Sequence, residues 1–344
     1  MRALLVIAVA LSATPVAAQQ KGKWVMPRTA DGRPDLQGNW SNATITPLER
    51  LSGVGPVLTA EQVAIAEGRT KSKLDSLSTS SDPNRSAPPK GGVSLGDPRF
   101  DAASGGTGGY NVFYIDAGNR IAIIDGEPRS SLIAWPATGR VPARTDAARE
   151  RLAAQRARLQ GMGEFDNPEN RPLAERCIIS FGSNAGPPML PNYFYNNNYT
   201  IVQTRDYVLI FTEMVHDARV IRLKDGPRLP AHLTPYMGDS RGRWVGDTLV
   251  IETTNIHPAQ AASFYGASSS MKVTERITRS DERTLRYEFT VEDPATFTES
   301  WGGVVPFNRM DELLYEYACH EGNYALSNVL SGARDQERRK AAKP

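Results

Sequence analysis

The sequence has few histidines, few cysteines and almost no excess charge. Of its 344 residues, 4 are His and 2 are Cys, and 40 Lys+Arg against 38 Asp+Glu give a formal net charge of +2. Without a basic field, the chain has little to attract nucleic acid or an anionic membrane surface. It also lacks the motifs HxH, HExxH and GxGxxG. Neither a close-spaced zinc site nor a dinucleotide-binding loop is therefore predicted.

Long apolar runs are missing beyond the first residues. The opening "MRALLVIAVALSATPVAAQQ" combines Arg2, a short apolar run and the small residues Val16-Ala17-Ala18. This pattern predicts a secretory signal peptide over residues 1–18, cleaved after Ala18. A membrane anchor would need roughly 20 apolar residues, and the run is shorter. We therefore expect a periplasmic or secreted protein without membrane insertion.

The two cysteines, Cys177 and Cys319, are predicted to form a disulfide because an exported chain meets an oxidising compartment. The bridge would close a loop of 319 − 177 = 142 residues. Chain-entropy arguments allow such a bridge at most about 4–5 kcal/mol. The alternative is a catalytic thiol, which export disfavours.

Composition divides the mature chain into four parts. Residues 19–77 contain a short strand and a helix, which Thr59 and Gln62 begin with a capping box. Residues 78–109 are rich in Gly, Ser and Pro and are predicted to be a flexible loop. Residues 110–330 form a β-rich domain with an inserted helix near residues 145–160, and residues 331–344 form a basic, solvated tail.

The second half of the chain has the pattern of a mainly β fold. From residue 199 onward, short apolar strands recur about every ten residues, with polar turns such as Gly246-Asp247 between them. Alternation places one set of side chains on a single face: Leu285, Tyr287, Phe289 and Val291. The pattern predicts an antiparallel meander that forms a barrel or a strongly curved sheet, with a few peripheral helices. A barrel of about eight strands can hold one small ligand.

Several long stretches resemble a known family. They are "ERC", "YTIVQTRDYVLIFTEMVHDARVIRL", "YMGDSRGRWVGDTLVIETTNI" and "YEYACHEGNY", with "DAGNRIAIIDGEPRSSLIAWPATGRVP" upstream. Together they are similar to a large family of exported proteins from environmental bacteria, over most of the mature chain. The resemblance implies export and a β-rich fold. It implies no particular reaction and no functional residue.

The histidines are the candidates for acid–base chemistry. In "TEMVHDARV", strand alternation sets Met214, His216 and Ala218 on one face and Asp217 on the other. If the first face points into the barrel, His216 can act as a neutral base. The alternative is a core histidine bonded to a backbone carbonyl.

His320 directly follows Cys319, so a disulfide would hold it rigidly beside Glu321. The alternative is an ordinary stapled strand end. We expect His216 and His320 to be catalytic, with Asp217 or Glu321 as partner. Spacing does not support a metal held by the two histidines, so no cofactor is predicted, and a long-range metal site stays an alternative.

Substrate-binding candidates come from two further motifs. In "GDSRGRW", Arg241 and Arg243 can grip a carboxylate beside Trp244. The favoured alternative is a turn whose Asp239 pairs with the arginines internally. The letters "GDSRG" match a lipase serine motif, but a strand is predicted to follow, which argues against a nucleophile elbow.

The stretch "PNYFYNNNYT" combines aromatic rings with amide groups. Tyr193, Tyr195 and Asn197 suit a ring-shaped ligand at a cavity mouth, because tyrosine offers a flat face and asparagine both donates and accepts. The alternative is a loop anchored by its aromatic side chains.

Two functions follow from these candidates. The first is an exported enzyme that carries out cofactor-independent acid–base chemistry, as a lyase, isomerase or hydrolase, on a small ring-bearing substrate inside the barrel. The second is a periplasmic binding or carrier protein with the same cavity and no chemistry. They differ in whether two titratable groups converge on one cavity. The composition does not indicate an oligomeric state.

Overall fold

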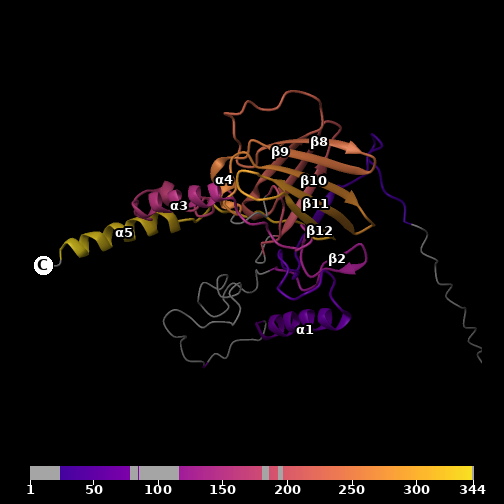
Figure 1. The fold of residues 1–344 in the computed structure, drawn as a ribbon, viewed down its shortest axis with the longest axis horizontal. Coiled ribbons are helices and arrows are strands. Elements are labelled where there is room, and N and C mark those ends of the chain that lie inside the picture. Colours follow the sequence, from indigo (N-terminus) through magenta and orange to yellow (C-terminus); the bar gives the residue numbers. More distant parts are fainter. Residues whose placement is uncertain (1–23, 78–83, 85–115, 180–185, 193–196, 343–344) are drawn as a thin grey trace, which may run out of the picture.

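The structure is a computed structural model that describes residues 24–77, 84, 116–179, 186–192 and 197–342. It is a closed β-barrel with helices at its periphery (Figure 1). The predicted mainly β fold with few helices is therefore confirmed. Apart from Asn84, the loop predicted over residues 78–109 lies outside the described residues.

Among the described residues, nine strands close the barrel in the order β1-β5-β6-β7-β8-β9-β10-β11-β12, since β1 also pairs with β12. They are β1 (Gly38–Ser41), β5 (Asn198–Gln203), β6 (Tyr207–Thr212), β7 (Ala218–Arg222), β8 (Asp239–Val245), β9 (Thr248–Thr254), β10 (Lys272–Arg279), β11 (Thr284–Glu292) and β12 (Trp301–Met310). Strand β4 (Ile133–Trp135) joins the sheet beside β12, and β2 (Ile123–Ile124) and β3 (Glu127–Pro128) form a separate hairpin.

Two features of the barrel depart from a simple meander. Strands β7 and β8 are parallel, with Ile221 opposite Ser240, whereas the other barrel pairs are antiparallel. A parallel pair needs a long return connection, which residues 223–238 provide. The second feature is the closure itself, because β1 comes from the N-terminal segment and lies between β5 and β12.

The interior of the barrel is a packed core. The predicted inward face of β11 is confirmed, since Leu285, Tyr287, Phe289 and Val291 are all fully buried. Aromatic rings meet across the interior, with centroid distances of 5.0 Å for Tyr199–Phe307 and 5.3 Å for Tyr287–Phe307. The predicted ligand cavity inside the barrel is therefore wrong in the described part of the chain, because large side chains occupy the inward positions.

The predicted face of β7 is also wrong. Arg219 and Ile221 are buried, whereas Val220 is 53% exposed and His216 is exposed. The prediction carried one strand alternation through residues 213–217, but a 3-10 turn, η3 (Met214–His216), separates β6 from β7. This turn shifts the phase by one residue, which moves every side chain of β7 to the opposite face.

The helices lie outside the barrel wall (Figure 1). Helix α1 (Ala60–Leu77) begins with the predicted capping box, in which Thr59 N donates to Gln62 Oε1 (2.9 Å) and Gln62 N to Thr59 Oγ1 (3.2 Å). The others are α3 (Asp146–Gln160), α4 (Pro258–Ser263), α5 (Ala325–Ala341) and the short 3-10 helix η2 (Pro168–Asn170). Within the described residues, no helix is both long and apolar enough to cross a membrane.

Most of residues 331–344, which were predicted to form a solvated tail, belong to helix α5. Its residues are good helix formers such as Ala, Leu, Gln and Arg, and i,i+4 pairing supports it, with Arg339 Nε 2.7 Å from Asp335. None of its residues is buried, so the tail is helical but still solvated.

Candidate functional site

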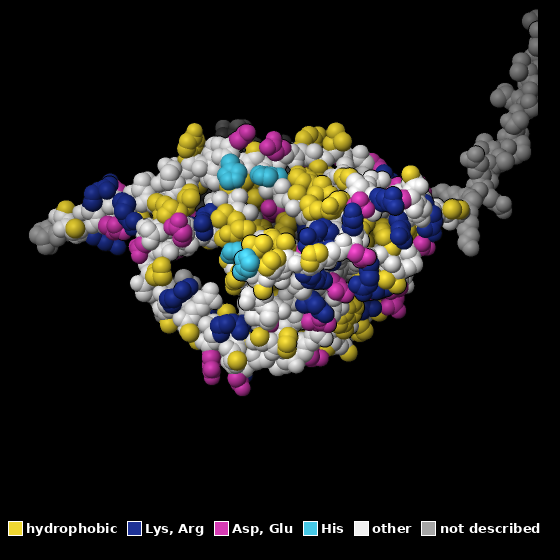
Figure 2. Space-filling model, turned by 90° about the horizontal axis from the view of Figure 1, so that it is seen from above, with side chains coloured by type: hydrophobic (Ala, Val, Ile, Leu, Met, Phe, Trp, Pro, Cys, Tyr) yellow, Lys and Arg dark blue, Asp and Glu magenta, His cyan; other side chains and the backbone are white. Residues whose placement is uncertain are grey.

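The structure brings His216 and His320 together, although they are 104 residues apart in the sequence. Their ring centroids are 6.3 Å apart, and both residues are exposed. Histidine side chains gather at two places on the face shown in Figure 2. The pair of His216 and His320 lies outside the barrel end rather than inside its core.

A tight connection between β6 and β7 positions His216. Val215 and His216 both have positive φ, at 59° and 48°, which is rare for side-chain-bearing residues and costs of order 1–3 kcal/mol each. Met214 (0% exposed) and Val215 (3%) anchor the connection in the protein. His216 Nδ1 lies 3.0 Å from the carbonyl oxygen of Tyr317. Because a carbonyl oxygen only accepts, Nδ1 donates this hydrogen bond, and Nε2 is the ring nitrogen that this contact does not use.

The predicted disulfide positions His320. Cys177 and Cys319 are bonded, with their Cα atoms 5.7 Å apart, which confirms the predicted pairing. Asn323 Nδ2 donates to Cys177 Sγ at 3.1 Å and to the carbonyl oxygen of Glu175 at 3.5 Å. The bridge thus ties the segment that contains His320 to residues 175–177.

A cleft of about 1040 Å³ adjoins this bridge. Its lining residues are Arg171, Ala174, Glu175, Glu213, Tyr315, Glu316, Tyr317, Ala318, Cys319, Glu321, Gly322, Asn323, Ala325 and Val329. The predicted partner Glu321 is among them. His216 and His320 are not lining residues but adjoin Tyr317 and Cys319, which are. Asp217 is half-buried and its carbonyl accepts from Thr212 N at 2.8 Å, so its backbone closes the turn.

Glu213 lines the cleft and also contacts Asn198, the first residue of β5, at the end of the barrel. It is 7% exposed and accepts a hydrogen bond of 2.8 Å from Asn198 Nδ2. The nearby Asp116 is exposed as a residue, yet desolvation of its carboxyl, together with the charge on Glu213, raises the pKa of Asp116. Sequence reasoning missed this pair as a site, because Asp116 and Glu213 are 213 − 116 = 97 residues apart in the sequence.

Arg171 and Tyr317, which line the cleft, each keep one protonation state. The hydrogen bonds that Arg171 donates, first to Glu164 and then to Glu175, raise the pKa of Arg171, so it stays a cation paired with both. Burial raises the pKa of Tyr317, so its hydroxyl stays protonated and can donate. The cleft therefore offers acceptors from Glu213 and Glu321 together with a phenolic donor.

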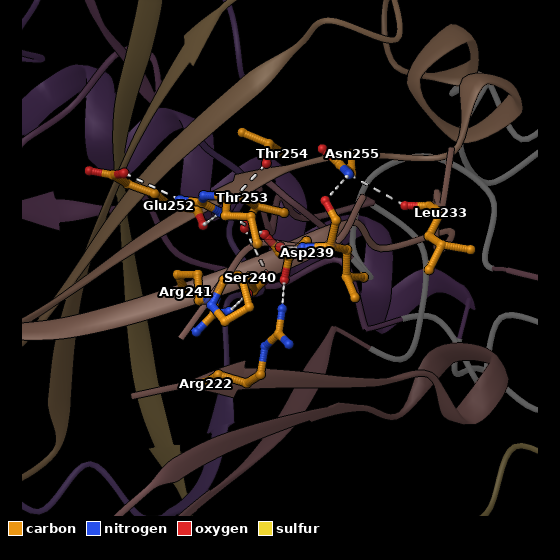
Figure 3. Close-up of polar contacts among 12 residues, drawn as sticks. Arg222, Leu233, Asp239, Ser240, Arg241, Glu252, Thr253, Thr254 and Asn255 are labelled. Carbon is orange, nitrogen blue, oxygen red and sulfur yellow. Dashed lines mark hydrogen bonds and ion pairs between the residues drawn. The ribbon is translucent and has the colours of Figure 1, made fainter. Parts of the chain in front are cut away.

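The side chains of the GDSRGRW motif anchor a loop (Figure 3). The favoured alternative, a turn in which Asp239 pairs with the arginines of the motif, is wrong, because the motif forms strand β8 and Asp239 pairs with Arg222 instead. Asp239 accepts hydrogen bonds from Arg222 and from Leu229 N (2.9 Å), and Arg241 donates to the carbonyl oxygens of Lys224 (3.1 Å) and Pro227. Asn255 Nδ2 adds further bonds to the same loop, at 3.2 Å to the carbonyl oxygen of Leu229. Asp239 and Arg241 thus fasten residues 223–238 to β8 and β9.

The other predicted substrate-binding residues do not join the histidines. Arg243 binds Glu252 at 3.0 Å, and together with Trp244 it lies where β8 ends, at the opposite end of the barrel. Asn197 is fully buried, and its Nδ2 donates to the carbonyl oxygen of Asp116 at 2.8 Å, so it has a structural role. Tyr193 and Tyr195 lie outside the described residues.

The structure also reveals a buried ion pair that the sequence reasoning missed. Arg219 donates to both carboxylate oxygens of Glu275, at 2.6 and 2.8 Å, and both side chains are buried. The letters carry no signal for it, because the neighbours of Arg219 are the apolar residues Ala218 and Val220, so alternation assigns Arg219 to the polar face. The wrong phase for β7 placed it outside.

Within the described residues, no group of three or more His, Cys, Asp or Glu side chains is arranged to hold a metal ion.

Comparison with known proteins found no match to this chain, whether among protein-family models, curated proteins or solved structures.

Proposed function

We propose that the chain is an exported enzyme that moves protons on a small ring-bearing organic substrate held in the cleft beside the disulfide. His216 Nε2 is the base and His320 the second proton carrier, with Glu321 or Asp217 as partner. The observation that supports this role is the 6.3 Å approach of the two imidazoles beside a cleft. Two titratable groups within reach of one substrate are the minimum for a lyase, isomerase or hydrolase without a cofactor.

The positioning of both histidines supports catalysis. The positive-φ backbone at Val215 and His216 is the kind of strain that concentrates at functional sites. The carbonyl of Tyr317 orients the ring of His216, and the disulfide restrains His320. A carrier protein that only binds its ligand would not need a fixed tautomer.

Proton transfer can be measured with a simple ring-bearing carbonyl compound. Cyclohexanone in D₂O exchanges its α protons, and the exchange is followed by NMR. We expect wild type to accelerate exchange, His216→Ala to abolish the acceleration, and His320→Ala to reduce it. His232→Ala is the matched control, because His232 is exposed in the 223–238 loop, away from the cleft lining.

The alternative function, a periplasmic binding or carrier protein, predicts a different result. Ring compounds would then bind, as seen by saturation-transfer NMR, while exchange would be equally slow in wild type and in all three variants. Export is tested separately. The mature protein recovered from the periplasm or medium should begin at Gln19, as measured by mass spectrometry.

A further inference from the structure

A second pocket lies at the barrel end opposite the histidines, near the end of β8. Its volume is about 540 Å³, and it is lined by Asp31, Arg33, Arg205, Asp206, Leu223, Arg243 and Trp244. Basic side chains gather over the right half of Figure 2, which is the end where β8 finishes in Figure 1. Nothing in the proposed proton-transfer chemistry uses this pocket.

The backbone around the pocket is held by hydrogen bonds between distant segments. Leu223 N donates to the carbonyl oxygen of Asp206 at 2.8 Å, which joins the end of β7 to the turn before β6. Arg28 binds Asp247 at 2.9 Å, which joins the N-terminal segment to the turn after β8. A site assembled from fixed segments loses little ordering entropy when a ligand enters.

Two guanidinium groups of the pocket, those of Arg33 and Arg205, have N–H donors that could bind a ligand. Among the described residues, the side chains of Arg33 and Arg205 make no hydrogen bond and no ion pair within 4.0 Å, and their electrostatic partner is Asp31. The hydroxyl of Thr29 donates to Asp31 Oδ1 at 2.6 Å. This hydrogen bond is the main cause that lowers the pKa of Asp31, and the positive charges of Arg33 and Arg205 lower it further. Both guanidinium groups therefore interact with the same carboxylate. The pocket lining thus contains three arginines and two aspartates.

Trp244 adds a flat apolar surface to this charge. Its ring is half-buried and packs against the barrel core, so it is held in place while one part lines the pocket. Arginine forks match the geometry of carboxylate and phosphate oxygens, and indole faces stack on rings.

We propose that this pocket binds a small organic anion, with a carboxylate or phosphate group on Arg33 and Arg205 and an attached ring against Trp244. Arg243 contributes from the pocket wall while it remains paired with Glu252. The proposal does not depend on the histidine site, because the two sites share no residue.

Isothermal titration calorimetry at low salt tests the proposal with phenyl phosphate and benzoate, and with phenol as the uncharged control. We expect one or both anions to bind, phenol not to bind, and affinity to fall as salt rises. The anion that binds more tightly identifies the preferred group.

Variants locate the binding. Arg33→Ala and Arg205→Ala should each weaken binding about tenfold, the loss expected for a charge-assisted hydrogen bond. Arg205→Lys should weaken binding less than Arg205→Ala, because it keeps the charge and loses the fork. Arg69→Ala on α1 is the matched control, an exposed arginine away from the pocket, and should change nothing.

Arg33 and Arg205 are both exposed, so their variants should keep the wild-type melting temperature. The proposal is overturned if neither anion binds wild type at millimolar concentration, if phenol binds equally well, or if the Arg33→Ala/Arg205→Ala double variant binds the anions as wild type does. His216→Ala should leave this binding unchanged, which separates the pocket from the histidine site.

Discussion

At the scale of single residues, the buried pair of Arg219 and Glu275 governs the barrel interior. Tyr287 Oη donates to Glu275 Oε1 at 2.8 Å and accepts from Met189 N at 2.8 Å. Burial raises the pKa of Tyr287 well above its usual value, so the phenol stays protonated and can donate. One carboxylate thus holds β7, β10 and β11 in register from the inside.

Removing one partner of this pair should destabilise the fold strongly. Arg219→Met leaves the Glu275 carboxylate buried without its cation, and we expect a loss of about 3–5 kcal/mol in the free energy of unfolding by urea. The double variant Arg219→Met/Glu275→Leu should lose less than the single one, because no charge is left unpaired. Arg276→Met is the control on β10, the strand that contains Glu275. It breaks an exposed contact with Glu288 and should cost under about 1 kcal/mol. A double variant at least as unstable as Arg219→Met contradicts this account.

Glu252 should make the protein sensitive to acid. The hydrogen bond from Arg243, aided by the charges of Lys272 and Arg228, lowers the pKa of Glu252 below its ordinary value of 4.5. A lowered folded-state pKa means that the ionised carboxylate stabilises the fold above pH 4.5, and that this contribution is lost as pH falls through the folded-state value. Glu252→Gln should therefore flatten the loss of stability below pH 4.5, as measured by urea unfolding at several pH values. An unchanged acid slope would count against the pairing.

At the scale of elements, the segment after β12 depends on its tether. From Asp311 to the end of α5 no described residue is buried, so packing alone holds this segment weakly. The disulfide joins it to Cys177, and the carbonyl of Tyr317 holds the ring of His216. The approach of the two histidines is therefore a product of the bridge rather than of the core.

The double variant Cys177→Ser/Cys319→Ser should release this segment and leave the barrel folded. We expect limited proteolysis to cut between residues 311 and 341, while the far-ultraviolet circular dichroism of the barrel persists. The loss in global stability should stay below the chain-entropy limit of about 5 kcal/mol, because the barrel core does not need the tether. Proton exchange on cyclohexanone should fall with the release. Equal protease resistance in the variant and in wild type would refute the tether.

At the scale of the whole molecule, closure of the barrel rests on a four-residue strand. β1 pairs on one side with β5 and on the other with β12. The side chain of Trp40, a residue of β1, is fully buried. Without β1, the sheet would have two open edges, which are sites of aggregation.

A chain that begins at residue 43 should fail to form the monomeric barrel. It loses Trp40, whose truncation alone typically costs about 3–5 kcal/mol, and it exposes β5 and β12. A chain that begins at residue 24 keeps β1 and should fold as the full chain does. Size-exclusion chromatography with circular dichroism distinguishes the two, and a soluble monomeric barrel from the shorter chain would contradict the role of β1.

Part of the fold could be predicted from the sequence because it depends on local chemistry. Alternation in Leu285, Tyr287 and Phe289 predicts the inward face of β11, and the turns after Val245 and Arg279 lie where polar residues interrupt the strands. The face of β7 could not be predicted this way, because a positive-φ turn changes the phase without leaving a pattern in the letters. His216 was therefore placed inside when it lies outside.

By itself, the sequence determined the strand-rich composition, the capping box of α1 and the pairing of its only two cysteines, since each depends on neighbouring residues or on a unique partner. The tertiary structure alone decided that β1 closes the ring, that aromatic side chains fill the interior, and that His216 meets His320 at the surface. These outcomes join residues that are distant in the sequence, such as Tyr199 and Phe307, and such contacts follow from packing and register rather than from any local preference.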